Sequence, residues 1–312
     1  MPGVWPGTEG VTEMPLHYAG VNSDPPISVE YLLRRQNRDG GWPYATGPSW
    51  TEPTVFAVMA ASTAQRHDAA ARGIAWLRGL QRPDGGWAPQ CGVEESTWVT
   101  ALAALLPPRQ IGIERHERAI SWLVRLTGRE SSPIYRLRQW LLGVNPPADQ
   151  SFHGWPWFPG TAAWVGPTAF GILALEQEQR RRPTLAIAER IELARRFLLA
   201  RMCREGGWNH GSARALGYDA RPYPETTGMA LLALHGIQSP EIERGLAAAQ
   251  RFLNECHSID GINWLRFGLA AHARLPAGYC PPALPFHTVR DASLALLADG
   301  GAAGRNPFLT SL

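Results

Sequence analysis

Residues 32–42 and 77–87 read LLRRQNRDGGW and LRGLQRPDGGW, and this repeated stretch decides the fold. Both copies end in Gln-x-x-Asp-Gly-Gly-Trp, and their tryptophans lie 45 residues apart. Weaker copies follow as GWPW at 154–157, REGGW at 204–208 and IDGINW at 259–264. A recurring pattern of this period is typical of folds built from stacked supersecondary units. The chain is therefore expected to be a repeat protein.

Two kinds of helix are predicted between these loops. Apolar segments rich in Ala, Leu and Gly begin at Thr54, Thr97, Thr168, Thr227 and Thr288. They are apolar on nearly all sides, which predicts buried helices. The segments at 69–80, 114–126, 185–201 and 241–253 instead carry arginines on one face and apolar residues on the other. That periodicity predicts outer, solvent-facing helices.

Buried and amphipathic helices that alternate in this way predict an inner ring wrapped by an outer ring. Further helices are expected at 28–36, 134–144 and 263–273. The fold class is therefore all-α, an α/α toroid (an α6/α6 barrel) of about twelve helices, six inner and six outer. We expect one toroid domain at 26–300, an extended segment at 1–25 and a tail at 301–312.

The two full repeats resemble the glutamine-tryptophan (QW) repeat of squalene and oxidosqualene cyclases. As a repeat pattern the resemblance extends over residues 29–298, and it implies the toroid of the terpene cyclase and protein prenyltransferase superfamily. The same toroid serves several activities, so the resemblance is more specific for fold than for function. The chain lacks the Asp-x-Asp-Asp motif of squalene cyclases and is about half the length of a two-domain cyclase. Residues 91–94, CGVE, do not match the Cys-Gly-Glu-Gln of the thioester proteins.

Composition excludes several classes of protein. All 30 basic residues are arginine, so Schiff-base chemistry and the lysine of a phosphate-binding loop are absent. The net charge of +3, without a basic block, argues against a nucleic-acid partner. Four scattered cysteines predict reduced thiols. With no signal peptide and no apolar run of about 20 residues, we expect a cytoplasmic protein that meets a membrane, if at all, at its surface.

Acidic residues recur just before the apolar helices. Glu52, Glu95 and Glu225 each precede a threonine by two residues, where the other two segments have glycine and phenylalanine. Parallel inner helices would bring these glutamates to one mouth of the central cavity. An acid at a helix N-terminus ordinarily caps it, but clustered carboxylates raise one another's pKa, and such a group can donate a proton. The candidate catalytic residues are Glu52, Glu95, Glu225, Asp291 and His287.

Aromatic residues crowd the same loops. Rings that face a cavity would suit an isoprenoid chain and stabilise carbocations, whereas rings stacked within loops would only be core. We take as candidate substrate-binding residues Trp50, Trp157, Trp164, Tyr223 and Phe286. The repeat tryptophans Trp42 and Trp87 are expected to be structural.

Zinc is the only cofactor for which the sequence offers candidate ligands. Cys280, His287 and Asp291 contain suitable ligands, and the last two lie four residues apart on one predicted helix face. The resemblance to prenyltransferases would require an Asp-x-Cys pair on another inner helix, which is not matched. Capping and core roles are the better interpretation, and we expect neither metal nor cofactor.

Three functional hypotheses follow. The leading one is a terpene cyclase-like or prenyltransferase-like enzyme that acts on a hydrophobic isoprenoid in the central cavity, by carboxylic-acid protonation or carbocation stabilisation. It requires that side chains do not fill the ring. The alternative, which the missing Asp-x-Asp-Asp motif favours, is a non-catalytic binding or scaffold barrel. A carbohydrate-active toroid is the third, for which two carboxyl groups about 5–9.5 Å apart would be needed.

Overall fold

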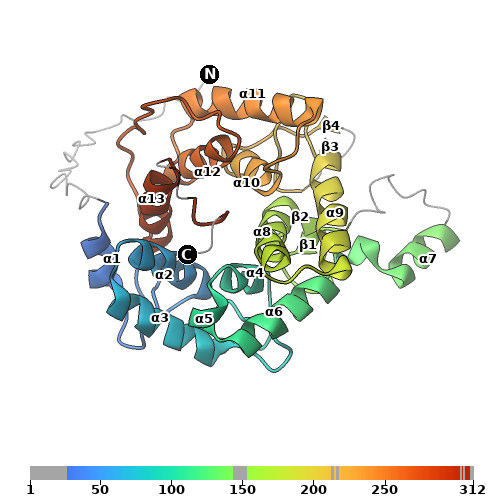
Figure 1. Ribbon diagram of the computed structural model, residues 1–312. Helices are drawn as coiled ribbons and strands as arrows, with labels where there is room; N and C mark the ends of the chain where they lie inside the picture. The colour runs from blue at the N-terminus through green and yellow to red at the C-terminus, as the bar shows by residue number, and fades with distance from the viewer. Residues whose placement is uncertain are drawn as a thin grey trace, which may run out of the picture.

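The computed structural model describes residues 27–142, 153–211, 214–215, 218–302, 304 and 306–309. The segment expected at 1–25 lies outside the described residues. The predicted all-α toroid is confirmed: an inner ring of helices is wrapped by an outer ring (Figure 1).

Within the described ranges, six helices form the inner ring. They are α2 (Thr51–Thr63), α4 (Val99–Ala104), α8 (Val165–Arg181), α10 (Pro224–Ala233), α12 (Ile259–Ala271) and α13 (Val289–Ala302). Each contacts the next, and α13 contacts α2, so the ring closes. Every residue of α2 from Thr51 to Ala61 is buried, as expected for a helix that is apolar on all sides.

The outer helices are amphipathic. They are α1 (Val29–Arg35), α3 (His67–Leu80), the short α5 (Pro108–Ile111), α6 (Ile113–Arg125), α9 (Leu185–Ala200) and α11 (Pro240–Glu255). Residues 272–288 connect α12 to α13 without a helix. Among the described residues, the expected six inner and six outer helices are met when the short α5 is included, and the proline-rich stretch from Pro276 to Pro285 does not support a further outer helix.

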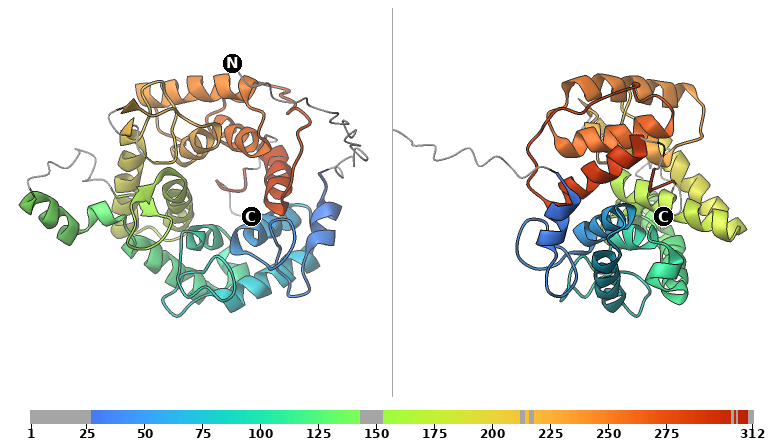
Figure 2. Two further views of the ribbon diagram at one scale, coloured as in Figure 1. Left: turned by 180° about the vertical axis from the view of Figure 1, so that it is seen from behind. Right: turned by 60° about the vertical axis from the view of Figure 1, so that its left-hand side comes forward.

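A few short elements lie outside the two rings. They are the 3₁₀ turn η1 (Arg129–Ser131), α7 (Pro133–Leu141) and two antiparallel hairpins, β1 (Trp155–Pro156) with β2 (Ala163–Trp164) and β3 (Arg214–Ala215) with β4 (Tyr218–Asp219). Helix α7 extends away from the toroid (Figures 1 and 2). None of the described helices is long and apolar enough to cross a bilayer.

The repeat residues join consecutive outer helices. The side-chain amide of Gln36 donates to the carbonyl oxygens of Gly40 (2.8 Å) and Ala69 (2.9 Å), which ties α1 to the start of α3. The indole of Trp42 is fully buried and donates to the carbonyl of Leu32 at 2.8 Å. The second copy makes the same bonds through Gln81 and Trp87. The repeat is therefore structural, as the sequence predicted.

A threonine hydroxyl fixes the register of four inner helices. Each accepts a bond of 2.8–3.0 Å from the backbone N–H of a buried tryptophan, in the pairs Trp42–Thr54, Trp87–Thr100, Trp155–Thr168 and Trp208–Thr227. In the second repeat this threonine is Thr100, three residues after the expected Thr97. The residue equivalent to Glu52 is consequently Trp98, and Glu95 falls in the preceding loop.

The centre of the ring is partly filled by the chain itself. Residues 306–309, part of the expected tail, enter the ring (Figure 1). Phe308 is fully buried there, with its ring centroid 5.0 Å from that of Phe267 and 5.6 Å from that of Trp264. Gln177 and Arg180, near the C-terminal end of α8, hydrogen-bond this segment. The cavity described below lies toward the opposite end, where the inner helices begin.

Glycines allow α10 and α12 to pack closely. A Cβ atom on Gly228 would lie 2.2 Å from the backbone carbon of Trp264, whereas one on Gly79 in α3 would meet nothing within 4 Å. We expect Gly228→Ala to lower the free energy of unfolding by about 1–3 kcal/mol. Gly79→Ala, the matched control, should raise it by about 0.5–1 kcal/mol. Urea denaturation measures both, and an unchanged Gly228→Ala protein would contradict this packing.

Candidate functional site

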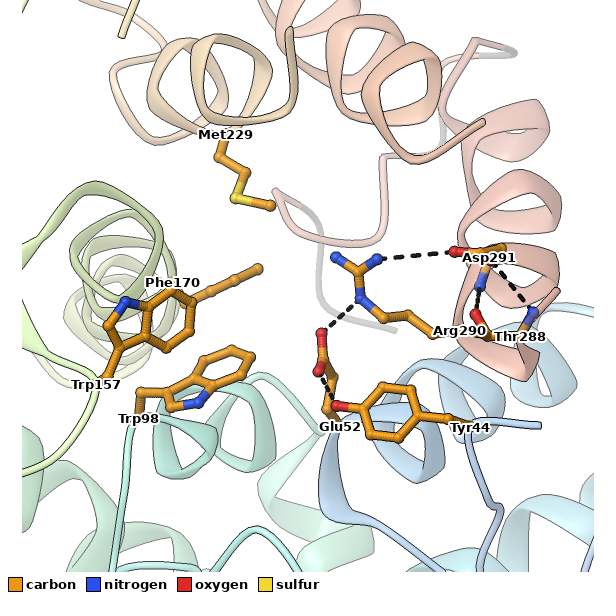
Figure 3. Close-up of a pocket in the computed structure, with 9 residues that line it drawn as sticks. All are labelled: Tyr44, Glu52, Trp98, Trp157, Phe170, Met229, Thr288, Arg290 and Asp291. Atoms are coloured by element: carbon orange, nitrogen blue, oxygen red, sulfur yellow. Dashed lines mark hydrogen bonds and ion pairs between the residues drawn. The ribbon is translucent and has the colours of Figure 1, made fainter. Parts of the chain in front are cut away.

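A cavity of about 370 Å³ opens at the end of the ring where the inner helices begin (Figure 3). It is lined by Tyr44, Glu52, Trp98, Trp157, Phe170, Met229, Thr288, Arg290 and Asp291. These residues come from the first two turns of α2, α8, α10 and α13 and from the loops before α2, α4, α8 and α13. Its volume lies within the range of about 300–1,000 Å³ that is usual for small-molecule sites.

One side of the cavity is an aromatic wall, made of Trp98, Trp157 and Phe170 with Met229 (Figure 3). The two indoles meet edge to face with centroids 4.7 Å apart, and Phe170 lies 5.7 Å from Trp98. The backbone N–H of Trp98 donates to the carbonyl of Trp157 at 3.2 Å, which holds the two loops together.

The floor of the cavity is also aromatic. Phe170 contacts Trp264 at 5.5 Å and Phe56 at 6.4 Å between ring centroids, and both of these rings contact Phe308. The Phe170–Trp264 and Phe56–Phe308 contacts are edge to face, and such pairs stabilise a core beyond the burial of apolar area. Phe170 therefore separates the cavity from the aromatic filling of the ring.

The opposite side is a polar wall, made of Tyr44, Glu52, Arg290 and Asp291, with Asp260 behind it. Arg290 donates from Nε to Glu52 Oε1 at 2.6 Å and from Nη1 to Asp260 Oδ1 at 2.7 Å. The Tyr44 hydroxyl donates to Glu52 Oε2, so both oxygens of this carboxylate accept a hydrogen bond. Arg290 Nη1 also lies 3.8 Å from Asp291 Oδ1.

Burial and charge set the ionisation of this wall. Burial disfavours the charged form of Arg290, but Glu52 and Asp260 outweigh it and raise its pKa above the usual value. Burial, and then the Glu52 charge, raise the pKa of Tyr44. Burial raises the pKa of Asp260 against the opposing effect of Arg290. One cation thus faces three acidic groups, a balance that favours positive charge on a ligand.

Of the predicted site residues, Glu52, Asp291 and Trp157 line the cavity. Asp291 Oδ2 also accepts from the backbone N–H groups of Thr288 (3.2 Å) and His287 (3.4 Å), so it caps α13 as well. His287 itself is exposed in the loop before that helix.

Two predicted glutamates lie elsewhere. Glu95 is exposed in the loop before α4, because the second repeat is in a different register. Glu225 is in the first turn of α10, with Oε1 3.4 Å from His210 Nε2. Burial raises the pKa of Glu225, but the hydrogen bond from His210, a backbone hydrogen bond and the charge of His210 together outweigh it, so the net pKa is lowered. The structure therefore does not gather three glutamates around one cavity.

The remaining predicted aromatic residues are not among the described lining of the cavity. Trp50, Trp164 and Tyr223 occupy the N-cap positions of α2, α8 and α10. Phe286 is buried edge to face against Tyr31, at 5.0 Å between centroids.

Sequence reasoning missed most of the lining. Trp98, Arg290, Phe170, Met229 and Asp260 are not among the site residues that the sequence predicted. Two signals were available. Thr100 offers an alternative register that puts Trp98 in the position of Glu52, and Arg290 is the only charged residue besides Asp291 in the first seven residues of α13.

The candidate zinc ligands do not come together. Cys280 is exposed, with its Sγ 3.9 Å from the carbonyl of Pro281, and Asp291 is occupied in capping α13 and beside Arg290. Across the part of the chain that the structure describes, no three His, Cys, Asp or Glu side chains are grouped to hold a metal ion.

Comparison with known proteins gives one sequence relative. No protein-family model matches the chain. An alignment over 128 positions is 30% identical to the squalene–hopene cyclase of Zymomonas mobilis subsp. mobilis and covers 34% of this chain. The match spans 19%, about a fifth, of the length of that cyclase.

Solved structures extend the comparison over most of the chain. The type II terpene cyclase MstE from Scytonema matches 90% of this chain and 77% of its own, with a TM-score of 0.52 and 18% identity. A GH8 endo-β-1,4-glucanase from an Achatina fulica gut metagenomic library matches 87% of this chain and 96% of its own, with a TM-score of 0.56 and 15% identity. The GH76 α-mannanase of Bacteroides thetaiotaomicron matches 89% of this chain and 94% of its own, with a TM-score of 0.56 and 11% identity. The chain therefore shares its toroid fold with terpene cyclases and glycoside hydrolases, and part of its sequence is similar to a squalene–hopene cyclase.

Proposed function

We propose that the protein is a terpene cyclase-like enzyme that binds a hydrophobic isoprenoid in the cavity and stabilises positive charge on it. The observation that carries this proposal is that an aromatic wall faces an acidic polar wall across one cavity. Burial of an apolar chain against the rings would drive binding. A desolvated carbocation above Trp98 or Trp157 would gain about 2 kcal/mol or more from each ring.

Glu52 is the proposed acid. In its protonated form, its O–H bond breaks as a C–H bond forms at one carbon of a substrate double bond, and the other carbon becomes the cation. Attack by a second double bond closes the ring, and loss of a proton to the Glu52 carboxylate completes an isomerisation. No co-reactant is consumed.

The neighbours of Glu52 decide when it can act. Tyr44 and Arg290 both donate to its oxygens, and charge-assisted bonds of this kind stabilise the carboxylate before protonation as well as after proton transfer. The acid form therefore requires the Tyr44 hydroxyl to release Oε2, which then carries the proton. Asp260 and Asp291 hold the guanidinium in place, and we assign Arg290 and Asp260 as positioning residues.

The charge of the polar wall favours cyclisation over prenyl transfer. A prenyl donor with a diphosphate group would bring several negative charges beside Glu52, Asp260 and Asp291, with Arg290 as the only cation of that wall. Like charges at this range repel. A neutral isoprenoid, which becomes cationic only during reaction, fits the same wall.

Glycoside hydrolysis is the second candidate, because the GH8 and GH76 enzymes share the toroid over most of the chain. Glu52 and Asp291 would be its carboxylate pair. Both lie beside Arg290 on one wall, however, whereas a glycosidase needs carboxylates on either side of the scissile bond.

The test is incubation of the purified protein with neutral isoprenoids of increasing length and, separately, with cello- and manno-oligosaccharides. We expect cyclic products of unchanged mass by gas chromatography with mass spectrometry. We also expect a tertiary-ammonium analogue of the isoprenoid to bind at least about tenfold more tightly than its neutral isostere. Sugar hydrolysis would instead support the second candidate. Tight binding without any product would favour the non-catalytic barrel.

Phe170 should limit the length of the ligand, because it forms the floor of the cavity. We expect Phe170→Leu to shift the preferred isoprenoid toward a longer chain, measured as relative affinity across the length series. Phe267→Leu removes a similar volume from the aromatic filling but does not line the cavity. This control should lose stability without a change in length preference, and a shift in both variants would contradict the assignment.

A further inference from the structure

Four inner helices share an equivalent position, two residues before the threonine that accepts the bond of a buried tryptophan. The residues at this position are Glu52, Trp98, Gly166 and Glu225. Glu52 and Trp98 line the cavity. On α8 the residue one turn further along, Phe170, lines it as well, and residues four apart share a side of a helix. Gly166 therefore lies on the cavity side of α8, where it offers no side chain.

The missing side chain of Gly166 leaves a notch beside the aromatic wall. A Cβ atom added there would lie 3.5 Å from Cη2 of Trp157 and 3.7 Å from Sδ of Met229, which are ordinary van der Waals distances. Both of these side chains line the cavity, and Met229 points into it (Figure 3). The notch is therefore about as wide as a methyl group, and its two sides are a ring edge and a thioether.

The fold does not require a glycine at this position. The φ angle of Gly166 is not in the left-handed region, and alanine is favoured over glycine within a helix. Other glycines of the inner ring are needed for packing: a Cβ atom on Gly171 would lie 2.6 Å from the ring of Trp155, and one on Gly228 would meet backbone at 2.2 Å. Gly166 has no such neighbour, so the space that it leaves serves the cavity.

We propose that the Gly166 notch takes one methyl branch of an isoprenoid and so selects a methyl-branched chain over a linear one. This inference rests on the proposed function. Isoprenoids carry methyl branches at regular intervals, and a branch seated between Trp157 and Met229 gains contacts with the ring edge and the polarisable sulfur. Sliding of the chain along the cavity would lift that branch out of the notch. A sugar hydroxyl would fit less well, because a thioether is only a weak hydrogen-bond acceptor.

The test measures, by calorimetry, the affinity of the full chain for farnesol and for dodecatrienol, which has the same main chain and double bonds without the methyl branches. In Gly166→Ala the new methyl group occupies the notch. We expect this variant to bind farnesol about tenfold more weakly than the wild type, the usual effect of one methyl or methylene group in an apolar pocket, and to bind dodecatrienol unchanged. Gly79→Ala, which makes the same exchange in the outer helix α3, is the matched control and should change neither affinity.

Both variants should fold, with melting temperatures no lower than that of the wild type, because alanine meets only ordinary contacts at either position. The proposal is overturned, while the proposed function stands, if Gly166→Ala binds farnesol as tightly as the wild type. It is overturned in the same way if the variant loses equal affinity for both alcohols, which would show that alanine only narrows the cavity. A wild-type protein that binds neither alcohol would overturn the proposed function together with this inference.

Discussion

Replacing Arg290 with methionine is expected to lower the free energy of unfolding by about 3–5 kcal/mol at neutral pH. The substitution leaves Glu52, which is 8% exposed, and Asp260 in the wall of the ring without their shared cation. Removal of one partner from a buried ion pair is costly because the remaining charge is desolvated and no longer has an opposite charge or a hydrogen-bond donor to compensate it.

The loss should depend on pH. Burial already raises the pKa of Asp260, and Arg290 opposes this rise, so the variant should raise it further. A carboxyl whose pKa is higher in the folded than in the unfolded state binds more protons when folded, so stability falls as pH rises through the interval between the two values. The penalty of Arg290→Met should therefore be small near pH 4 and complete at neutral pH.

Denaturant unfolding at several pH values measures this effect. Arg290→Met/Glu52→Gln/Asp260→Asn should recover much of the lost stability, because no buried charge then lacks a partner. Arg274→Met is the surface control: Arg274 pairs with Glu243 at 3.2 Å, both are more than half exposed, and its loss should cost no more than about 1 kcal/mol. A pH-independent penalty would show that Arg290 acts through packing and not through charge.

The fold was predictable because its decisive contacts are local and repeated. Gln36 bonds to the next outer helix, α3, and Trp42 bonds back to α1, the outer helix before its loop. Gln81 and Trp87 make the equivalent bonds to α6 and α3. A pattern of this kind requires no knowledge of how the ring closes. The contacts that build the polar wall do require it, since Arg290 meets Glu52 only because α13 packs against α2.

The position of Trp98 was missed for a different physical reason. Thr97 and Thr100 are three residues apart, so both lie on the same side of a helix, and either could accept the bond from a buried tryptophan. The choice depends on the length of the loop between Trp87 and α4, which apolar periodicity does not report. Because the register differs by about one helical turn, Trp98 lines the cavity where the Thr97 register would have placed Glu95.

Glu52→Gln should lower the rate of product formation by about 10²–10⁴-fold, the usual contribution of a positioned general acid. Glutamine has nearly the same shape as glutamate but has no proton to give to an alkene. The variant should fold, because Arg290 keeps Asp260 at 2.7 Å and Asp291 at 3.8 Å. It should also still bind a neutral isoprenoid, because the aromatic wall is unchanged.

Two further glutamates provide controls for that result. Glu95→Gln changes an exposed loop residue and should leave the rate unchanged, although sequence alone placed Glu95 and Glu52 in equivalent positions. Glu225→Gln removes the partner of His210, at the first turn of a neighbouring inner helix, and should alter stability more than rate. The comparison is made on initial rates at saturating substrate together with binding measured by calorimetry. A loss of rate in Glu95→Gln as large as that in Glu52→Gln would place the chemistry outside the cavity. If Glu52→Gln instead loses isoprenoid binding but keeps its rate at saturating substrate, Glu52 is a binding residue, and the proton donor is another group of the polar wall.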